Sequence, residues 1–245
     1  MQRTWLITGC STGFGRAMAK VLLARGDRVA ATARRPETLD ELVARHSEQA
    51  LALKLDITRE DDIAAAVAAC RERFGVIDVL VNNAGYGVPS PAESESIDRF
   101  EQTMDINVTA PFHLAQLAGR HMLAAGSGSI VNIASVLGLA ASAPIKEVSY
   151  CASKGAVVNL TRELGAQWGR KGVRVNAIAP GWFETEMNDN MFATESGMAY
   201  IVDGTPMGRP GYEGELDGAL LFLASDASSF VTGQVLFVDG GWTAI

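Results

Sequence analysis

The stretch Thr8-Gly9-Cys10-Ser11-Thr12-Gly13-Phe14-Gly15 decides the fold. It follows an apolar run over residues 4–8 that has the composition of a strand, and it precedes a helical pattern over residues 17–25. Glycines let the main chain approach a phosphate, and the first N–H groups of the next helix are free to bind it. The spacing is GxxxGxG rather than GxGxxG, but a loop placed after the first strand predicts a dinucleotide site.

Strands and helices alternate along the rest of the chain. Apolar, β-rich runs predict strands over residues 4–8, 28–33, 50–55, 77–82, 129–134, 173–179 and 234–238. Helical spacing of apolar residues predicts helices over residues 17–25, 63–74, 100–125, 152–170 and 213–224. This alternation is typical of a parallel sheet covered on both faces, so we expect an α/β fold with right-handed crossovers.

Length and composition indicate one domain over residues 1–245, with 48% hydrophobic and 20% charged residues. The net charge is -7, and no run of lysine and arginine exceeds two residues. The sequence therefore predicts neither nucleic acid nor an anionic membrane as a partner.

The N-terminus lacks the hydrophobic region of a signal peptide, and the longest weakly polar stretch, residues 133–145, is too short to span a bilayer. We expect a cytoplasmic protein. The three cysteines are scattered without a CxxC motif, which predicts no metal site. Cys151, beside Tyr150, is either reactive or a buried spectator, and the three histidines lie outside the motifs.

Residues 182–211 break the alternation of strands and helices. This segment has no clean strand and combines glycines with apolar and aromatic side chains such as Trp182, Phe183, Met187 and Met191. A segment of that length outside the sheet is usually functional. We expect a lid over the substrate; the alternative is a helical pair that packs on the core or on another subunit.

Tyr150 and Lys154 lie four residues apart at the start of a predicted helix, so both side chains occupy one face. A tyrosine is a poor acid or base at neutral pH unless its phenolate is stabilised, and a nearby cation stabilises it. The pair is a candidate for proton transfer.

The end of the second predicted strand bears on the choice of nicotinamide cofactor. Residues 31–35 read Ala-Thr-Ala-Arg-Arg and include no carboxylate to accept hydrogen bonds from a ribose. Arg34, with Arg35 as a second candidate, can instead bind a 2'-phosphate. We therefore expect NADP(H) rather than NAD(H), unless the two arginines are simply solvated.

Further motifs follow in order along the chain. They are Asn82-Asn83-Ala84-Gly85, Ser135, Tyr150-x-x-x-Lys154 and Pro180-Gly181, each at the end of a predicted strand or shortly after it. With the glycine loop, they make essentially the whole chain resemble the short-chain dehydrogenase/reductase family. The resemblance implies a three-layer Rossmann-type fold with a seven-stranded, mainly parallel sheet, assembled as a homotetramer or homodimer.

The resemblance also implies roles for four residues. Tyr150 matches the catalytic acid/base, and Ser135 matches the hydroxyl that binds the substrate carbonyl. Lys154 would lower the pKa of the tyrosine and hold the nicotinamide ribose. Asn107 matches the asparagine that anchors a water to that lysine, although it could be an ordinary polar helix residue.

The cofactor contacts implied by the resemblance extend along the chain. Asp56 and Ile57 would lie at the adenine, Asn83 to Gly85 on the adenosine side, and Thr185, after Pro180 and Gly181, at the carboxamide. Asp56 could instead cap a helix, and Thr185 could face water. The full set is Gly9, Ser11, Thr12, Gly13, Phe14, Gly15, Arg34, Arg35, Asp56, Ile57, Asn83, Ala84, Gly85, Tyr150, Lys154, Pro180, Gly181 and Thr185.

The chain departs from the family in the fourteen residues between Ser135 and Tyr150, an insert that includes Pro144-Ile145-Lys146-Glu147. We expect the longer loop to reshape the wall of the pocket and leave the chemistry intact. Transfer of substrate identity from shorter relatives is correspondingly weakened.

The resulting hypothesis is an oxidoreductase that interconverts a neutral, apolar or cyclic ketone and its secondary alcohol by hydride transfer. Three alternatives stay open. The run at 206–210 and Val238-Asp239-Gly240-Gly241 resemble 3-oxoacyl carrier-protein reductases, and residues 182–187 and 241–245 resemble polyol or sugar-acid dehydrogenases. A cofactor sensor without catalysis is the third, although no residue of the catalytic set is lost.

Overall fold

Seven parallel strands form one sheet in the described part of the chain, residues 2–143 and 145–245. Their order is β3-β2-β1-β4-β5-β6-β7. The chain starts inside the sheet with β1, adds β2 and β3 on one side, and then adds β4 to β7 on the other side. The strands are β1 (Thr4–Ile7), β2 (Arg28–Ala33), β3 (Ala50–Lys54), β4 (Val79–Asn82), β5 (Gly128–Ile133), β6 (Val173–Pro180) and β7 (Val235–Val238). The predicted strands are confirmed to within two residues at their ends. Pro144 of the insert lies outside the described residues.

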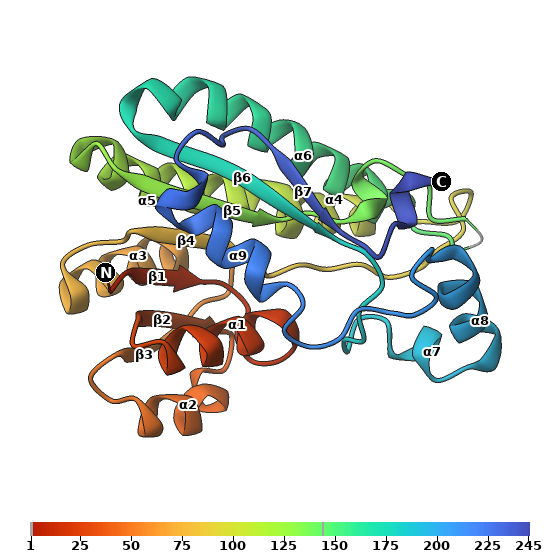
Figure 1. Ribbon diagram of the computed structural model, residues 1–245, viewed down its shortest axis with the longest axis horizontal. Helices are drawn as coiled ribbons and strands as arrows, with labels where there is room; N and C mark the ends of the chain where they lie inside the picture. The colour runs from red at the N-terminus through yellow and green to blue at the C-terminus, as the bar shows by residue number, and fades with distance from the viewer. Residues whose placement is uncertain (1, 144) are drawn as a thin grey trace.

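The helices lie on both faces of this sheet and beyond the carboxyl ends of its strands (Figure 1). In the described residues they are α1 (Gly13–Ala24), α2 (Asp40–Arg45), α3 (Glu60–Phe74), α4 (Ile97–Met104), α5 (Ala110–Ala125), α6 (Val148–Trp168), α7 (Asp189–Phe192), α8 (Glu195–Gly204) and α9 (Asp217–Ala224). Helix α6 starts four residues earlier than predicted, which puts Tyr150 in its first turn. Helix α9 starts four residues later than predicted, after Gly214 at φ +90.

Strand side chains point alternately to the two faces, and each face has its own apolar core. Trp5 and Ile7 of β1 pack in the core beneath α1, α2 and α9. Leu6, between them, packs in the core beneath α3, α5 and α6. All three side chains are at most 1% exposed. The three-layer αβα fold is confirmed, with one sheet shared by both cores.

The helix predicted over residues 100–125 is interrupted. Helix α4 ends at Met104, a π-helical turn spans Asp105–Thr109, and α5 then begins at Ala110. Pro111 has no N–H to donate to the carbonyl four residues back, and Ala110 N–H donates to Asp105 O, five residues back. Asn107 lies in this widened turn, 2% exposed.

The 182–211 segment lies beyond the carboxyl end of β6, where it includes α7 and α8 (Figure 1). Its base is closed because the N–H of Gly211 donates to Trp182 O at 2.8 Å. Trp182 and Tyr200 of this segment pack edge to face with each other and with Trp242 of the C-terminal turn, with ring centroids 5.3 to 5.9 Å apart. Among the described helices, none combines the length and the apolar character that crossing a membrane requires.

Candidate active site

A cleft of about 620 Å³ lies at the carboxyl ends of the central strands. It brings together most of the residues that the sequence singled out. Those lining it are Gly9, Ser11, Thr12, Gly13, Phe14, Arg34, Asp56, Ile57, Asn83, Ala84, Gly85, Ser135, Tyr150, Lys154, Pro180, Gly181 and Thr185. Gly15, Arg35 and Asn107 are not part of the lining.

The glycine loop is held tightly against the end of β4. Gly9 has φ +71, and a Cβ on Gly15 would clash with the Gly9 carbonyl oxygen. The Asn83 amide donates to the main-chain oxygens of Thr8 at 2.8 Å and Gly9 at 3.1 Å. Gly15 and the Asn83 amide therefore shape the loop from behind, while its other residues face the cleft.

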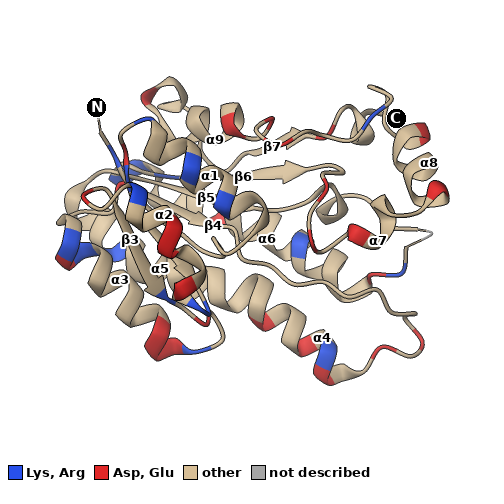
Figure 2. Ribbon diagram, turned by 90° about the horizontal axis from the view of Figure 1, so that it is seen from below, with Lys and Arg blue, Asp and Glu red and all other residues tan. Residues whose placement is uncertain are grey.

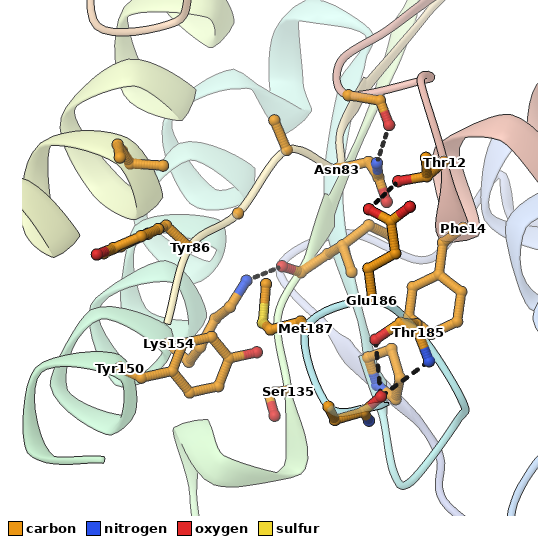
Figure 3. Close-up of a pocket in the computed structure, with 18 of the residues that line it drawn as sticks. Thr12, Phe14, Asn83, Tyr86, Ser135, Tyr150, Lys154, Thr185, Glu186 and Met187 are labelled. Carbon is orange, nitrogen blue, oxygen red and sulfur yellow. Dashed lines mark hydrogen bonds between the residues drawn. The ribbon is translucent and has the colours of Figure 1, made fainter. Parts of the chain in front are cut away.

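Helix α1 presents its N-terminus to this cleft. Its N-cap residue, Thr12, makes no side-chain cap hydrogen bond, and the first turn carries no acidic residue. The Thr12 hydroxyl instead donates to Glu186 Oε2 at 3.0 Å, which ties the loop to the 182–211 segment (Figure 3). Free N–H groups and the positive end of the helix dipole fit a diphosphate.

The ends of β2 and β3 are marked by Arg34 and Asp56. Arg34 lines the cleft, whereas the adjacent Arg35 lies outside the lining, with its carbonyl accepting a hydrogen bond from Thr38 Oγ1 at 2.7 Å. Hydrogen bonds from Thr58, at 2.7 and 3.0 Å, lower the pKa of Asp56, and Arg34 contributes to that shift. Asp56 thus lines the cleft and closes a local turn at the same time.

Ser135, Tyr150 and Lys154 converge on one wall of the cleft (Figure 3). Ser135 follows β5 and begins a short 3-10 turn, with its hydroxyl accepting from the Leu137 N–H at 3.1 Å. Tyr150 lies in the first turn of α6, and Lys154 Nζ is 5.4 Å from the centroid of its ring. The same Nζ donates to Ile133 O at 2.8 Å.

Burial dominates the electrostatics of this group, while the expected effect of Lys154 on the pKa of Tyr150 stays a prediction. Burial raises the pKa of Tyr150 above its ordinary value, and the Ser135 hydroxyl offsets only part of that effect. Burial also lowers the pKa of Lys154 to about 8. One N–H of the ammonium donates to the Ile133 carbonyl, and burial of the phenol favours its protonated form, which can donate.

Asn107 lies behind the cleft wall. Its side chain bonds both main-chain polar groups of Tyr86, at 2.8 and 2.7 Å, and donates to Ser153 Oγ at 2.9 Å. A Cβ on Gly85 would lie 3.6 Å from both Asn107 Oδ1 and Lys154 Nζ. Asn107 therefore joins the loop after β4 to α6, next to Gly85.

Several lining residues were missed by the sequence analysis. They include Tyr86, Pro89, Gln102, Ile106 and Leu137, and Ile145 had appeared only as part of the insert. Gln102 and Ile106 are four residues apart, a spacing that places both on one helix face and could have indicated them. Glu147 also lines the cleft, although the sequence showed it only as part of the insert. In the described residues, no group of three or more potential metal ligands gathers.

Two curated relatives resemble the chain over nearly all of its length. Gluconate 5-dehydrogenase of Gluconobacter oxydans (strain 621H) is 42% identical over 241 residues, covering 97% of this chain and 93% of the relative. NAD-dependent glycerol dehydrogenase of Listeria innocua serovar 6a (strain ATCC BAA-680 / CLIP 11262) is 36% identical over 240 residues, covering 97% and 92%.

The fold leads to the same group of proteins. A crystal structure of a gluconate 5-dehydrogenase from Burkholderia cenocepacia J2315, in complex with NADP and tartrate, matches with a TM-score of 0.95 and 38% identity, covering 100% of this chain and 97% of that one. The family model described as Enoyl-(Acyl carrier protein) reductase matches residues 9–243. The chain therefore belongs to the short-chain dehydrogenase/reductase family and is an oxidoreductase.

Proposed function

We propose that the protein interconverts a neutral ketone and its secondary alcohol with NADP(H). The observation that carries this proposal is the convergence of Ser135, Tyr150 and Lys154 on one wall of a cleft that also includes the glycine loop. A carbonyl placed between these side chains can receive a proton on its oxygen. No histidine lines the cleft in the described residues.

The residues of the cleft fit the cofactor. The N–H groups at the start of α1 and the loop before it would hold the diphosphate, and Arg34 would bind a 2'-phosphate. Asp56 and Ile57 would contact the adenine, Lys154 the nicotinamide ribose, and Thr185 the carboxamide. When bound, NADP(H) supplies or accepts the hydride.

Tyr150 handles the proton in this proposal. Because burial keeps its phenol protonated, Tyr150 donates its proton to the carbonyl oxygen during reduction and takes it back during oxidation. Ser135 orients the same oxygen through its hydroxyl. Lys154 completes the group, one helical turn from Tyr150.

A neutral substrate is favoured by the charges around the cleft. Arg34 and Lys154 are the only basic residues in its described lining, against Asp56, Glu147 and Glu186. Apolar side chains such as Leu137, Ile145 and Met187 line it as well. The second candidate is a polyol dehydrogenase, which the likeness to a glycerol dehydrogenase favours.

The 182–211 segment is our proposed substrate lid, since its first half supplies Trp182, Met187 and Met191 to the cleft.

A homotetramer or homodimer also remains a proposal. It is supported by the exposed apolar side chains Ile97 of α4 and Phe112 of α5, which are 70% and 42% exposed. Sedimentation of the purified chain tests the assembly, and the cytoplasmic location remains a prediction from the sequence.

The test of the proposed function follows the absorbance of the reduced cofactor with a panel of neutral ketones, polyol-derived ketoses, sugar acids and a 3-oxoacyl thioester. Each substrate is run with NADPH and with NADH, on the wild type and on Tyr150→Phe. Neutral carbonyls reduced with NADPH by the wild type only would support the proposal. Full turnover by Tyr150→Phe, or preference for the thioester, would contradict it.

A further inference from the structure

Glu147 is a carboxylate in the cleft that the proposed chemistry does not use. It lies three residues before Tyr150, is half-buried, and lines the same cavity. Its main chain is fixed: Glu147 O accepts from the Cys151 N–H at 2.9 Å, and the residue forms an isolated bridge with Ser90. The side chain is therefore carried by a rigid main chain at the edge of the reaction site.

The carboxylate of Glu147 has neither a hydrogen-bond donor nor a cationic partner among the described residues. Burial raises its pKa above the ordinary value, as expected for a carboxyl group removed from water without compensation. Its charge also contributes to raising the pKa of Tyr150, so the two side chains lie within electrostatic reach. An unpartnered, half-buried acceptor beside a catalytic phenol favours a ligand that brings a donor.

The protein's own cations do not serve Glu147. Lys154 Nζ is bonded to Ile133 O at 2.8 Å. Arg34 lies at the end of β2, near Asp56, whose pKa it helps to lower. Neither basic residue of the described cleft lining therefore pairs with Glu147, and its donor can come from water or from the substrate.

We propose that Glu147 accepts a hydrogen bond from a hydroxyl group next to the reacting carbon of the substrate. This deepens the proposed function, on which it rests, by naming the substrate class: neutral polyhydroxylated compounds, that is, polyols and the matching ketoses. Gln102 and Asn190, which also line the cleft, offer neutral amides to further hydroxyl groups. Glu147 is then a residue that determines specificity and has no part in the proton transfer.

Charge distinguishes this class from sugar acids. The 182–211 segment has five acidic residues and one basic residue. Its helices α7 and α8 carry acidic residues and no basic ones in the view of Figure 2. Of these acidic residues Glu186 lines the cleft together with Glu147, and the segment's basic residue, Arg209, is not part of the described lining. A substrate carboxylate on this side of the cleft would therefore meet two acidic side chains.

The test uses a series that shares one acetyl group and changes one substituent: hydroxyacetone, butanone, aminoacetone and pyruvate, with erythrulose as a longer ketose. Each is reduced with NADPH by the wild type, by Glu147→Gln, and by Glu93→Gln, which removes the same charge at an exposed position. NADPH binding and thermal melting are measured for all three proteins. These measurements show whether a variant is folded and loaded.

We expect wild-type kcat/KM to favour hydroxyacetone over butanone by about tenfold or more, the effect of one hydrogen bond to a charged acceptor. Glu147→Gln should lose about tenfold with hydroxyacetone and erythrulose, keep its rate with butanone, and gain rate with pyruvate. Glu93→Gln should leave all ratios unchanged.

Equal wild-type rates with butanone and hydroxyacetone would overturn the inference and leave the proposed function intact. So would a uniform loss across the series in Glu147→Gln, or a preference for aminoacetone. A wild type that binds NADPH and reduces none of the five compounds, nor any neutral ketone of the wider panel, would overturn the proposed function together with the inference. Because the wild-type ratio needs no variant, the test holds even if Glu147→Gln fails to fold.

Discussion

The side-chain amide of Asn107 pairs with both main-chain polar groups of Tyr86. Asn107 Oδ1 accepts from the Tyr86 N–H at 2.8 Å, and Asn107 Nδ2 donates to Tyr86 O at 2.7 Å. The amide thus supplies the two main-chain hydrogen bonds that a neighbouring strand would otherwise give Tyr86. These hydrogen bonds hold the loop after β4 against the Tyr150 ring. The loop passes so close that a Cβ on Gly87 would lie 2.7 Å from Tyr150 Cδ2.

Asn107→Leu should destabilise the fold by about 2 to 4 kcal/mol, because it leaves the main-chain groups of Tyr86 without their partners. Urea unfolding measures the change. Thr109→Val, in the same π-helical turn, removes only an exposed hydroxyl bond to Asp105 and should cost less than about 0.5 kcal/mol. Equal losses for the two variants would refute the importance of the clamp.

Gly87→Ala should lower kcat with little effect on cofactor binding, since its Cβ would push the Tyr150 ring out of place. Moving a catalytic side chain out of its reactive position costs about tenfold or more in rate. Gly218→Ala in α9 is the matched control, as no atom lies within 4 Å of its added Cβ. Steady-state rates and NADPH titrations check both variants, and an unimpaired Gly87→Ala would show that the loop yields.

Lys154 should make the stability of the fold depend on alkaline pH. Its pKa is about 8 in the folded protein against an ordinary value of 10.5, so the unfolded chain binds more protons between these values. Stability should therefore rise with pH across that window. Relative to Lys154→Met, the wild type should gain about 2 kcal/mol between roughly pH 7 and pH 10.

Urea titrations of wild type and Lys154→Met across this range make the comparison. Lys154→Met also loses the bond to Ile133 O, but this loss is the same at every pH. It therefore cancels when the difference in unfolding free energy between the two proteins is compared across pH values. A difference that stays constant with pH would mean that Lys154 keeps its ordinary pKa in the fold.

Arg34→Ala should raise the KM for NADPH by about ten- to a hundredfold and change the KM for NADH little, because only a 2'-phosphate needs the guanidinium. Arg35→Ala is the matched control one residue on, outside the cleft lining. Parallel KM values for the two cofactors decide the matter. An equal rise in the KM for NADPH in both variants would mean that Arg35 also binds the 2'-phosphate. No change in either variant would indicate NAD(H) as the cofactor.

The strands, most of the helices and many residues of the cleft were predictable because local signals repeat along this chain. Apolar, β-rich runs predicted the strands, and apolar spacing of period 3.6 predicted most of the helices. The glycine loop and Tyr150 with Lys154 occupy strand or helix ends, which a parallel sheet brings to one edge. The helical break at 105–109 was missed, since apolar spacing does not register an extra residue in one turn.

The sequence by itself determined the α/β fold and most of the predicted site residues that line the cleft, because these follow from local periodicity and from motif order. Only the tertiary structure separated Arg34 from Arg35, directed Lys154 at Ile133 O, and left Glu147 with no partner in the described part of the chain. These outcomes depend on which distant groups meet a side chain and how much water they exclude. Contacts between residues far apart in the chain decide both, and no local pattern encodes them.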